Sequence, residues 1–333
     1  MNPIAVVNTS TNDELSIEMI IGTTCNFKCS YCFPECNDGK YRWPVGSQVD
    51  TIHKNLSHLF DVYKAYGKTK FAILITGGEP TLWPELGSFA NYFKEKYDAR
   101  ISISTNGSRT MRWWKQHAHN FSSIGVSVHN EESDIEHIIE LLDWVYLNTD
   151  TAVHAAVLMD NKNWDKCVSM VERLQQHNVP WLVRAREVID GNDIVEYTNS
   201  QLEYLTNKTK KSPPLEYRKK MEQENKINDR IGKAFTIYKD SKEDFSSVKW
   251  YANNWHLVKG WKCSLGVDRF VVNPDGMISG SCKADNVFNL ERPLNIYDNA
   301  LPDKFSLKDI NPLICKMPAC MCSTELALSK EMV

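Results

Sequence analysis

The feature that most constrains the fold is a regular alternation of two hydrophobic patterns between Ser16 and about Ile189. Short apolar runs, rich in β-branched residues, predict strands near 17–21, 71–76, 100–105, 123–128, 152–158 and 182–188. Between these runs, apolar residues recur at helical spacing, notably within 52–63, 86–93 and 135–145. Six alternating units of this kind predict an α/β fold with a parallel sheet and a site at the carboxyl ends of its strands.

Composition narrows the class of protein. A chain of 333 residues with 42% hydrophobic content can bury a large core without disulfides. A formal charge of −3 gives no electrostatic case for a nucleic-acid or membrane partner. The basic run 208–220 contains Glu216 and is typical of a solvated helix face. We also find no apolar stretch as long as a membrane span and no signal peptide, so we expect a cytoplasmic protein.

Nine of the ten cysteines fall into two groups with metal-like spacing. Cys167 stands apart within a helical pattern and is expected to be a small buried residue. In the first group, Cys25, Cys29 and Cys32 follow directly on the strand predicted at 17–21. Three thiolates can hold three irons of a [4Fe-4S] cluster and leave the fourth iron open, whereas a structural zinc needs four ligands. A zinc knuckle completed by Cys36 is the alternative.

A second motif follows the strand predicted at 71–76. Gly77-Gly78-Glu79-Pro80 ends this strand, and glycines there allow another group to approach the backbone closely. Taken alone, the motif is also compatible with an ordinary strand-to-helix turn, in which Glu79 favours the helix N-terminus.

The cysteine spacing, Cys-x3-Cys-x2-Cys with Tyr31 before the last cysteine, resembles the signature of the radical S-adenosylmethionine (AdoMet) superfamily. The Gly-Gly-Glu motif stands where that family has its own. The resemblance implies a partial (β/α)6 TIM-like barrel and a cluster whose open iron binds AdoMet, which is then cleaved to a 5′-deoxyadenosyl radical. It also implies an external low-potential electron donor of flavodoxin or ferredoxin type. AdoMet would contact Tyr31, with Gly77, Gly78 and Glu79 at its ammonium group.

Further candidates lie at strand ends. Ser102 and Ser104 share a face of the third strand, which leads into Asn106; the family's AdoMet contacts often come from such a stretch, so we select Ser104 and Asn106. The fourth strand places Ser127 and His129 at the barrel mouth. Each of these residues could equally satisfy a local backbone donor in a turn.

Arg184 and Arg186 are predicted to lie on one face of the sixth strand. Two guanidinium groups on one face suggest an anion, so Arg184 is a candidate for a carboxylate or phosphate of AdoMet or substrate. An ion pair with Glu or Asp of neighbouring strands is the alternative.

We divide the chain into a barrel (1–190), a polar helical linker (191–250) and a C-terminal domain (251–333). In the last part, Asn273-Pro274-Asp275-Gly276 predicts a β-hairpin. Five cysteines surround it or follow it: Cys263, Cys282, Cys315, Cys320 and Cys322. This pattern is similar to the twitch element of the SPASM/twitch branch, which implies a second, auxiliary [4Fe-4S] cluster. A structural zinc is the alternative, and which four of the five cysteines bind stays open.

The expected reaction is hydrogen abstraction from a small molecule or peptide, giving net oxidation or a new bond. A nucleotide cyclase-like rearrangement is the other enzymatic hypothesis. Molybdenum-cofactor GTP cyclases share the barrel but end in Gly-Gly, whereas this chain ends at Lys330-Glu331-Met332-Val333. A hypothesis from another class is a non-catalytic iron-sulfur or zinc protein that carries electrons or acts as a scaffold.

Overall fold

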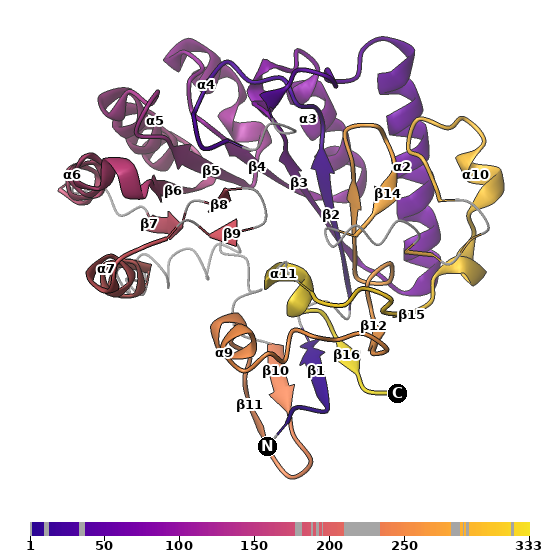
Figure 1. Cartoon of the computed structure of the whole chain (residues 1–333). Coiled ribbons are helices and arrows are strands. Elements are labelled where there is room, and N and C mark those ends of the chain that lie inside the picture. The colour runs from indigo at the N-terminus through magenta and orange to yellow at the C-terminus, as the bar shows by residue number, and fades with distance from the viewer. Residues whose placement is uncertain are drawn as a thin grey trace.

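A computed structural model describes residues 2–9, 13–32, 37–176, 182–187, 189–190, 193–194, 196–209, 234–280, 287–288, 290, 293–320 and 323–333. Its main element is an eight-stranded sheet ordered β14-β13-β2-β3-β4-β5-β6-β7, with helices along its outer face (Figure 1). Six of the strands are parallel and adjacent in chain order: β2 (Glu14–Ile20), β3 (Lys70–Thr76), β4 (Arg100–Thr105), β5 (Ser123–Val128), β6 (Ala152–Met159) and β7 (Leu182–Glu187). The predicted α/β fold with a partial (β/α)6 barrel is confirmed.

Each of these six strands is followed by a helix. The helices are α2 (Ser47–Tyr66), α3 (Leu86–Tyr97), α4 (Met111–His117), α5 (Ile135–Asn148), α6 (Trp164–Gln175) and α7 (Asn199–Thr209). Short 3-10 turns add η2 (Pro80–Leu82), η3 (Ala118–Asn120) and η4 (Asn161–Asn163). Helix α4 was not predicted, because its seven residues include a single buried side chain, Trp114, and show no periodicity.

The alternation of residue types along the strands explains which face is covered. On β4, Ile101 and Ile103 are buried against the helices, while Ser102 and Ser104 are half-buried on the opposite, inner face. The helical side is a packed aromatic and aliphatic core. In it, Phe60 of α2 stacks on Phe71 of β3 with ring centroids 4.3 Å apart, and Cys167 of α6 is fully buried as predicted.

The predicted hairpin is present as β13 (Arg269–Val272) and β14 (Ile278–Ser279). Its position was not predicted from the sequence. Strand β13 pairs in parallel with β2 and so extends the barrel sheet beyond its first strand. Two ion pairs secure this junction. Lys68 contacts Asp268 at 2.5 Å with both side chains buried, and Arg269 pairs with Glu18.

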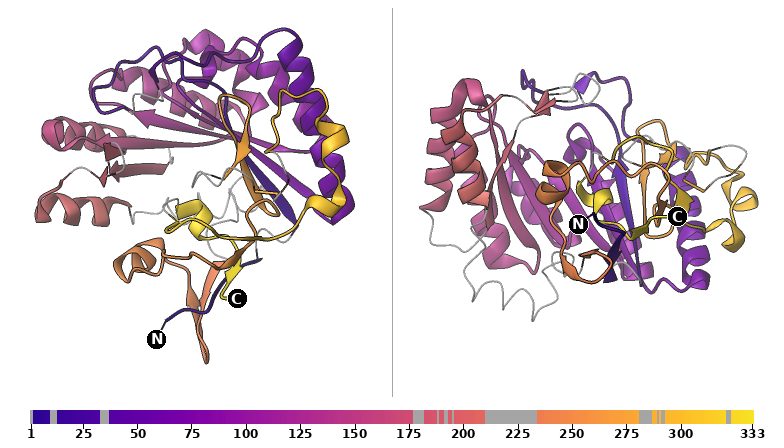
Figure 2. Two further views of the ribbon diagram at one scale, coloured as in Figure 1. Left: turned by 45° about the vertical axis from the view of Figure 1, so that its right-hand side comes forward. Right: turned by 60° about the horizontal axis from the view of Figure 1, so that its bottom comes forward.

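A second sheet joins the two ends of the chain. Its strand order is β11-β10-β1-β16-β12-β15, and every pairing in it is antiparallel. Figure 2 shows both termini on this side of the molecule, away from the helices of the barrel. The strands are β1 (Ala5–Asn8), β10 (Ala234–Ile237), β11 (Lys242–Asp244), β12 (Lys262–Cys263), β15 (Leu313–Ile314) and β16 (Lys330–Glu331).

The span predicted as a polar linker therefore contributes two strands, β10 and β11, to this second sheet. The same span holds the short hairpin formed by β8 (Ile189–Asp190) and β9 (Asp193–Ile194) on its border, and α9 (Ser247–Ala252). Most of the basic run 208–220 lies outside the described residues. Near the C-terminus are α10 (Leu301–Lys304), η5 (Leu307–Asp309) and α11 (Ser323–Leu326).

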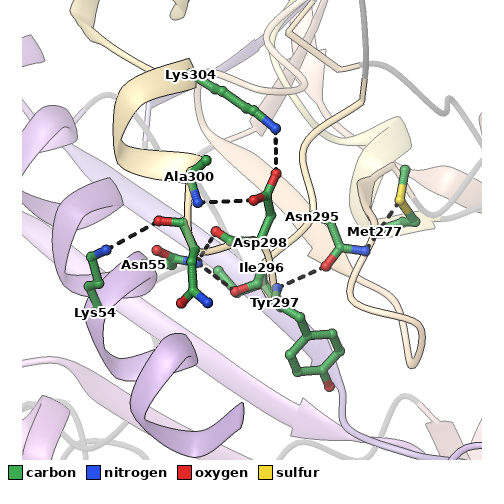
Figure 3. A network of polar contacts seen from close by, with 10 residues as sticks. Lys54, Asn55, Met277, Asn295, Ile296, Tyr297, Asp298, Ala300 and Lys304 are labelled. Carbon is green, nitrogen blue, oxygen red and sulfur yellow. Dashed lines mark hydrogen bonds and ion pairs between the residues drawn. The ribbon is translucent and has the colours of Figure 1, made fainter. Parts of the chain in front are cut away.

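Polar contacts attach the segment 295–304 to helix α2 (Figure 3). The buried side-chain amide of Asn55 donates to the carbonyls of Ile296 and Asp298, both at 2.8 Å. Lys304 pairs with the Asp298 carboxylate at 2.5 Å. A part of the chain that follows the hairpin is thus packed on the outer side of the first barrel helix. In the described part of the chain, no helix has both the length and the apolar composition that crossing a bilayer requires.

Candidate functional site

The first cysteine group lies in the loop after β2, at the carboxyl edge of the sheet. Cys29 is buried, Cys25 and Cys32 are half-buried, and each of the three is a thiol outside any disulfide. The pKa of Cys29 is raised to about 12, first by burial and then by the neighbouring thiol of Cys32, with Glu131 and Cys25 adding to it. The structure therefore brings the three thiols of the predicted ligand set together.

These residues fit a cluster held at three corners. The three are free thiols of one loop, and three thiolates can each bind a different iron of a cubane and leave its fourth iron open. The hydroxyl of Thr24, next to Cys25, is buried and has no hydrogen-bond partner among the described residues. Cys36, the alternative fourth ligand, lies outside the described residues.

The two glycines after β3 lie against the start of the cysteine loop. A Cβ at Gly77 would come within 2.6 Å of the Gly22 carbonyl oxygen, and one at Gly78 within 2.3 Å of the Thr24 carbonyl oxygen. Gly77 also has a φ of +135°. The amides of Gly78 and Glu79 donate to the carbonyls of Gly22 and Thr24, both at 2.9 Å. Glycine is required here because two backbone segments are in contact.

Glu79 connects this loop to the end of β4. Its buried carboxylate accepts from the amide of Thr81 at 2.9 Å, from the Thr105 hydroxyl at 2.7 Å and from the amide of Asn106 at 2.6 Å. The Thr81 hydroxyl donates as well. Burial raises the pKa of Glu79, and these donors oppose the rise. Both oxygens of the residue expected at the AdoMet ammonium thus hold protein groups in place.

Asn106 reaches from the end of β4 to the cysteine loop. Its side-chain amide donates to the Asn26 side-chain oxygen at 3.0 Å and lies 3.7 Å from the Cys25 sulfur. Ser104 is half-buried on the inner face of β4, directly across from Gly125 of β5. Asn106 is thus beside the cysteines, whereas Ser104 is placed deeper on the same strand.

Tyr31 is held by the residues that follow β5. Its hydroxyl donates to the side-chain oxygen of Asn130 at 3.1 Å and lies 3.2 Å from Nδ1 of His129. The His129 ring stacks on Tyr31 and meets Phe27 edge-on. Burial lowers the pKa of His129 to about 4 and raises the pKa of Tyr31 far above its usual range. Asn130 is fully buried, and its amide lies 3.3 Å from the Asp160 carboxylate.

Two further candidates, Ser127 and Arg184, lie at the same level of the sheet. Ser127 of β5 is half-buried and pairs with Ala156 of β6, which pairs with Arg184 of β7. Arg186 is two positions further along the same strand. The registers place Ser127 and Arg184 two strands apart, at the same level of the sheet.

One half-buried residue of the inner face was not selected from the sequence. The His154 ring of β6 lies over Gly125 of β5, where an added Cβ would be 2.7 Å from two of its ring atoms. The sequence contains a signal for this residue, because His154 is a histidine within the apolar run 152–159 and the preceding strand contains a glycine.

The second cysteine group lies where the C-terminal strands meet. Cys263 of β12 is buried, and Cys315 directly follows β15, the strand that pairs with β12. Burial is the main reason that the pKa of Cys263 is raised; Lys330 lowers it and the nearby Cys315 adds to the rise. Cys320 is buried as well, and its backbone amide donates to the His256 carbonyl at 2.9 Å. Cys282 and Cys322 lie outside the described residues.

Comparison with known families identifies the barrel. The sequence model of the radical SAM superfamily matches residues 19–184, which hold the cysteine triplet, the Gly-Gly-Glu motif and strands β3 to β6. The chain belongs to the radical SAM superfamily. It is therefore an enzyme of that superfamily, and membership implies a [4Fe-4S] cluster and AdoMet as cofactors.

Two solved structures share the fold. The protein described as native anSMEcpe with bound AdoMet aligns over 89% of this chain and 82% of its own, with a TM-score of 0.51 and 15% identity. SuiB of Streptococcus suis aligns over 87% of this chain and 65% of its own, with a TM-score of 0.50 and 14% identity. At these identities the likeness concerns the fold alone.

Curated relatives match part of the chain. A GTP 3',8-cyclase of Haemophilus influenzae (strain PittGG) is 32% identical over 127 residues, or 37% of this chain and 35% of its own length. An S-adenosylmethionine-dependent nucleotide dehydratase of Thermoplasmatales archaeon (strain ISO4-H5) is 27% identical over 188 residues, or 52% of this chain and 63% of its own length. The chain thus spans less than two thirds of each.

Proposed function

We propose that this radical SAM enzyme reductively cleaves AdoMet and abstracts hydrogen from a small molecule or peptide, for net oxidation or bond formation. Cys25, Cys29 and Cys32 each bind one iron of a [4Fe-4S] cluster. When bound, the cluster and AdoMet supply a 5′-deoxyadenosyl radical, with methionine as the other product and one electron consumed. That electron comes from an external flavodoxin- or ferredoxin-type donor.

The observation that carries this proposal is that the ends of three strands all contact the loop that holds the three thiols. The loop after β3 is hydrogen-bonded to the cysteine loop through Gly78 and Glu79. The end of β4 reaches the same loop through Asn106. The end of β5 contacts it at Tyr31. Three thiols in a loop fixed from three sides match a cluster that needs an open iron.

The remaining residues have distinct proposed roles. Tyr31, Gly77, Gly78, Ser104, Asn106 and Ser127 form the AdoMet site, with Arg184 available for an anionic group of AdoMet or substrate. Glu79 belongs to the same site but acts by positioning, because its oxygens accept from Thr105 and Asn106. A carboxylate buried in this way keeps the ends of β3 and β4 together.

The C-terminal part (251–333) is proposed to be a twitch-like domain that binds an auxiliary [4Fe-4S] cluster. Its support is the proximity of Cys263 and Cys315 and the burial of Cys263 and Cys320. Cys282 and Cys322 complete the group of five cysteines from which the four cluster ligands would come. The auxiliary cluster accepts the electron of the product radical or anchors the substrate. In this division the six barrel strands lie within 1–190, and 191–250, which contributes β10 and β11 to the second sheet, leads to the C-terminal domain.

A nucleotide substrate is the second candidate. The curated relatives described above are named as a GTP 3',8-cyclase and a nucleotide dehydratase, and these names favour a nucleotide as the substrate. Incubation of the reduced enzyme with AdoMet and each of the common nucleoside triphosphates would test it. A nucleotide that accelerates 5′-deoxyadenosine release and is itself consumed would establish this candidate.

The main experiment measures AdoMet cleavage. The anaerobically reconstituted enzyme is incubated with dithionite and AdoMet, and 5′-deoxyadenosine is quantified by liquid chromatography and mass spectrometry. Replacing Cys25, Cys29 and Cys32 by Ala should abolish release. Cys167→Ala is the control for the loss of a cysteine, because this thiol is buried in the helical layer and is not one of the proposed cluster ligands. Absence of release from the reconstituted wild-type enzyme would refute the proposal.

A further inference from the structure

The segment directly after β5 holds the cysteine loop at successive residues. His129 and Asn130 contact the Tyr31 hydroxyl. Glu131 accepts from the Ser30 amide at 2.6 Å and from the Ser30 hydroxyl at 2.5 Å. Glu132 accepts from the Lys28 amide at 3.3 Å. We call Glu131 and Glu132 the acidic pair. Four consecutive residues of one loop thus contact residues 28–31, which include Cys29.

The acidic pair affects the electrostatics of the cysteines in two ways. It places two carboxylates, both on exposed residues, beside the buried Cys29. It also accepts hydrogen bonds from the backbone amides of Lys28 and Ser30, the residues on either side of Cys29. Negative charge close to the Cys29 sulfur is therefore disfavoured by this pair.

We propose that Glu131 and Glu132 lower the reduction potential of the cluster held by Cys25, Cys29 and Cys32. This rests on the proposed function, because it needs that cluster to form. Reduction adds one negative charge to the site, and two carboxylates nearby make that addition less favourable. Net charge, hydrogen bonds to sulfur and solvent exposure are the quantities by which proteins set cluster potentials. The pair acts by positioning charge and binds neither iron nor substrate.

The placement of the pair also predicts how the effect depends on salt. Both carboxylates belong to exposed residues, so dissolved ions screen their charge. Screening is already strong beyond about 10 Å at 0.1 M salt and beyond about 3 Å at 1 M. The influence of the acidic pair on the cluster should therefore weaken as salt is added. A purely structural role in holding the loop would lack this dependence.

The test is a redox titration of Glu131→Gln, Glu132→Gln and the double variant. Glutamine keeps an oxygen to accept from the Ser30 amide, and its NH2 group can donate to the Ser30 hydroxyl. Charge is thus removed while the contact stays. The reconstituted full-length proteins are poised at fixed potentials. Electron paramagnetic resonance follows the reduced-cluster signal that changes on adding AdoMet, which separates it from any auxiliary cluster.

We expect each single variant to raise the ratio of reduced to oxidised cluster about threefold at a fixed potential, or about 28 mV at 59 mV per tenfold. The double variant should shift it further, and 1 M salt should diminish both shifts. Glu136→Gln is the matched control, because it removes the same charge from an exposed residue that pairs with Arg173. It should titrate like the wild type.

The outcomes separate this inference from the proposed function. If the wild type forms an AdoMet-sensitive cluster and the variants titrate at the same potential, the inference is overturned and the proposed function stands. A shift that Glu136→Gln reproduces, or that is unchanged in 1 M salt, also overturns it. If the wild type forms no AdoMet-sensitive cluster, both fall together.

Discussion

Replacing Glu79 by Ala should destabilise the protein before any ligand is bound. The carboxylate is 2% exposed and accepts hydrogen bonds from two backbone amides and two hydroxyls. Those donors come from Thr81, in the turn after β3, and from Thr105 and Asn106, at the end of β4. The variant would therefore separate two strand ends as well as remove a charge.

The magnitude follows from the donors left behind. The amides of Thr81 and Asn106 lose their acceptor inside the protein, and each buried, unsatisfied donor costs about 1–3 kcal/mol. The two hydroxyls can rotate to other acceptors and are left out of the sum. The burial that raises the pKa of Glu79 works in the opposite direction, because the variant no longer buries a carboxylate. We expect a net loss of about 3 kcal/mol.

The assay is urea unfolding of the protein in the absence of AdoMet. Glu79→Gln should fall between the wild type and Glu79→Ala, because its single oxygen keeps some of the donors. The control is Glu140→Ala, which removes an exposed glutamate from α5. If Glu79→Ala unfolds at the same urea concentration as Glu140→Ala and loses only AdoMet binding, Glu79 acts on the ligand and the positioning argument is refuted.

Two further predictions concern the site, and a third concerns the junction between β2 and the hairpin. Gly78→Ala puts a methyl 2.3 Å from the Thr24 carbonyl oxygen, so cluster content after reconstitution should fall severalfold; wild-type iron content would contradict this. The pKa of His129 is about 4 in the folded protein and 6.5 in the unfolded chain, so lowering the pH from 6.5 to 4 should reduce the free energy of unfolding by about 3 kcal/mol. Unfolding measured as a function of pH should show that His129→Gln abolishes this loss. Asp268→Asn leaves Lys68 buried without its carboxylate and should cost about 3–5 kcal/mol, whereas Lys68→Met with Asp268→Leu should unfold near the wild type.

Local signals predicted most of the barrel. The six strands were identifiable because each is a short apolar run bounded by turn residues, and the hairpin because Asn273 to Gly276 is a strong turn sequence. The pairing of β13 with β2 was not predictable, because the two strands are far apart in sequence and each has the pattern of an ordinary strand. For the same reason the second sheet, in which β1 pairs with β10 and β16, was missed.

The site was predicted by residue type better than by role. The cysteine triplet and the Gly-Gly-Glu motif were identified by their spacing. The sequence could not tell that Gly78 contacts Thr24 or that Glu79 accepts from Asn106, because both contacts join different strand ends. Glu131 and Glu132 were passed over, since charged residues after a strand are common in solvated loops. Only their hydrogen bonds to the cysteine loop distinguish them.

The parallel pairing of β2 with β13 has a consequence for how the protein is made. Arg269 and Ser16 contact each other although 253 positions separate them. On the ribosome, all six strands of the barrel emerge before the strand that covers the outer edge of β2 is synthesised. Until then that edge offers unpaired backbone groups to other nascent chains. The edge of β2 is therefore open to aggregation during translation and is covered once β13 has paired with it.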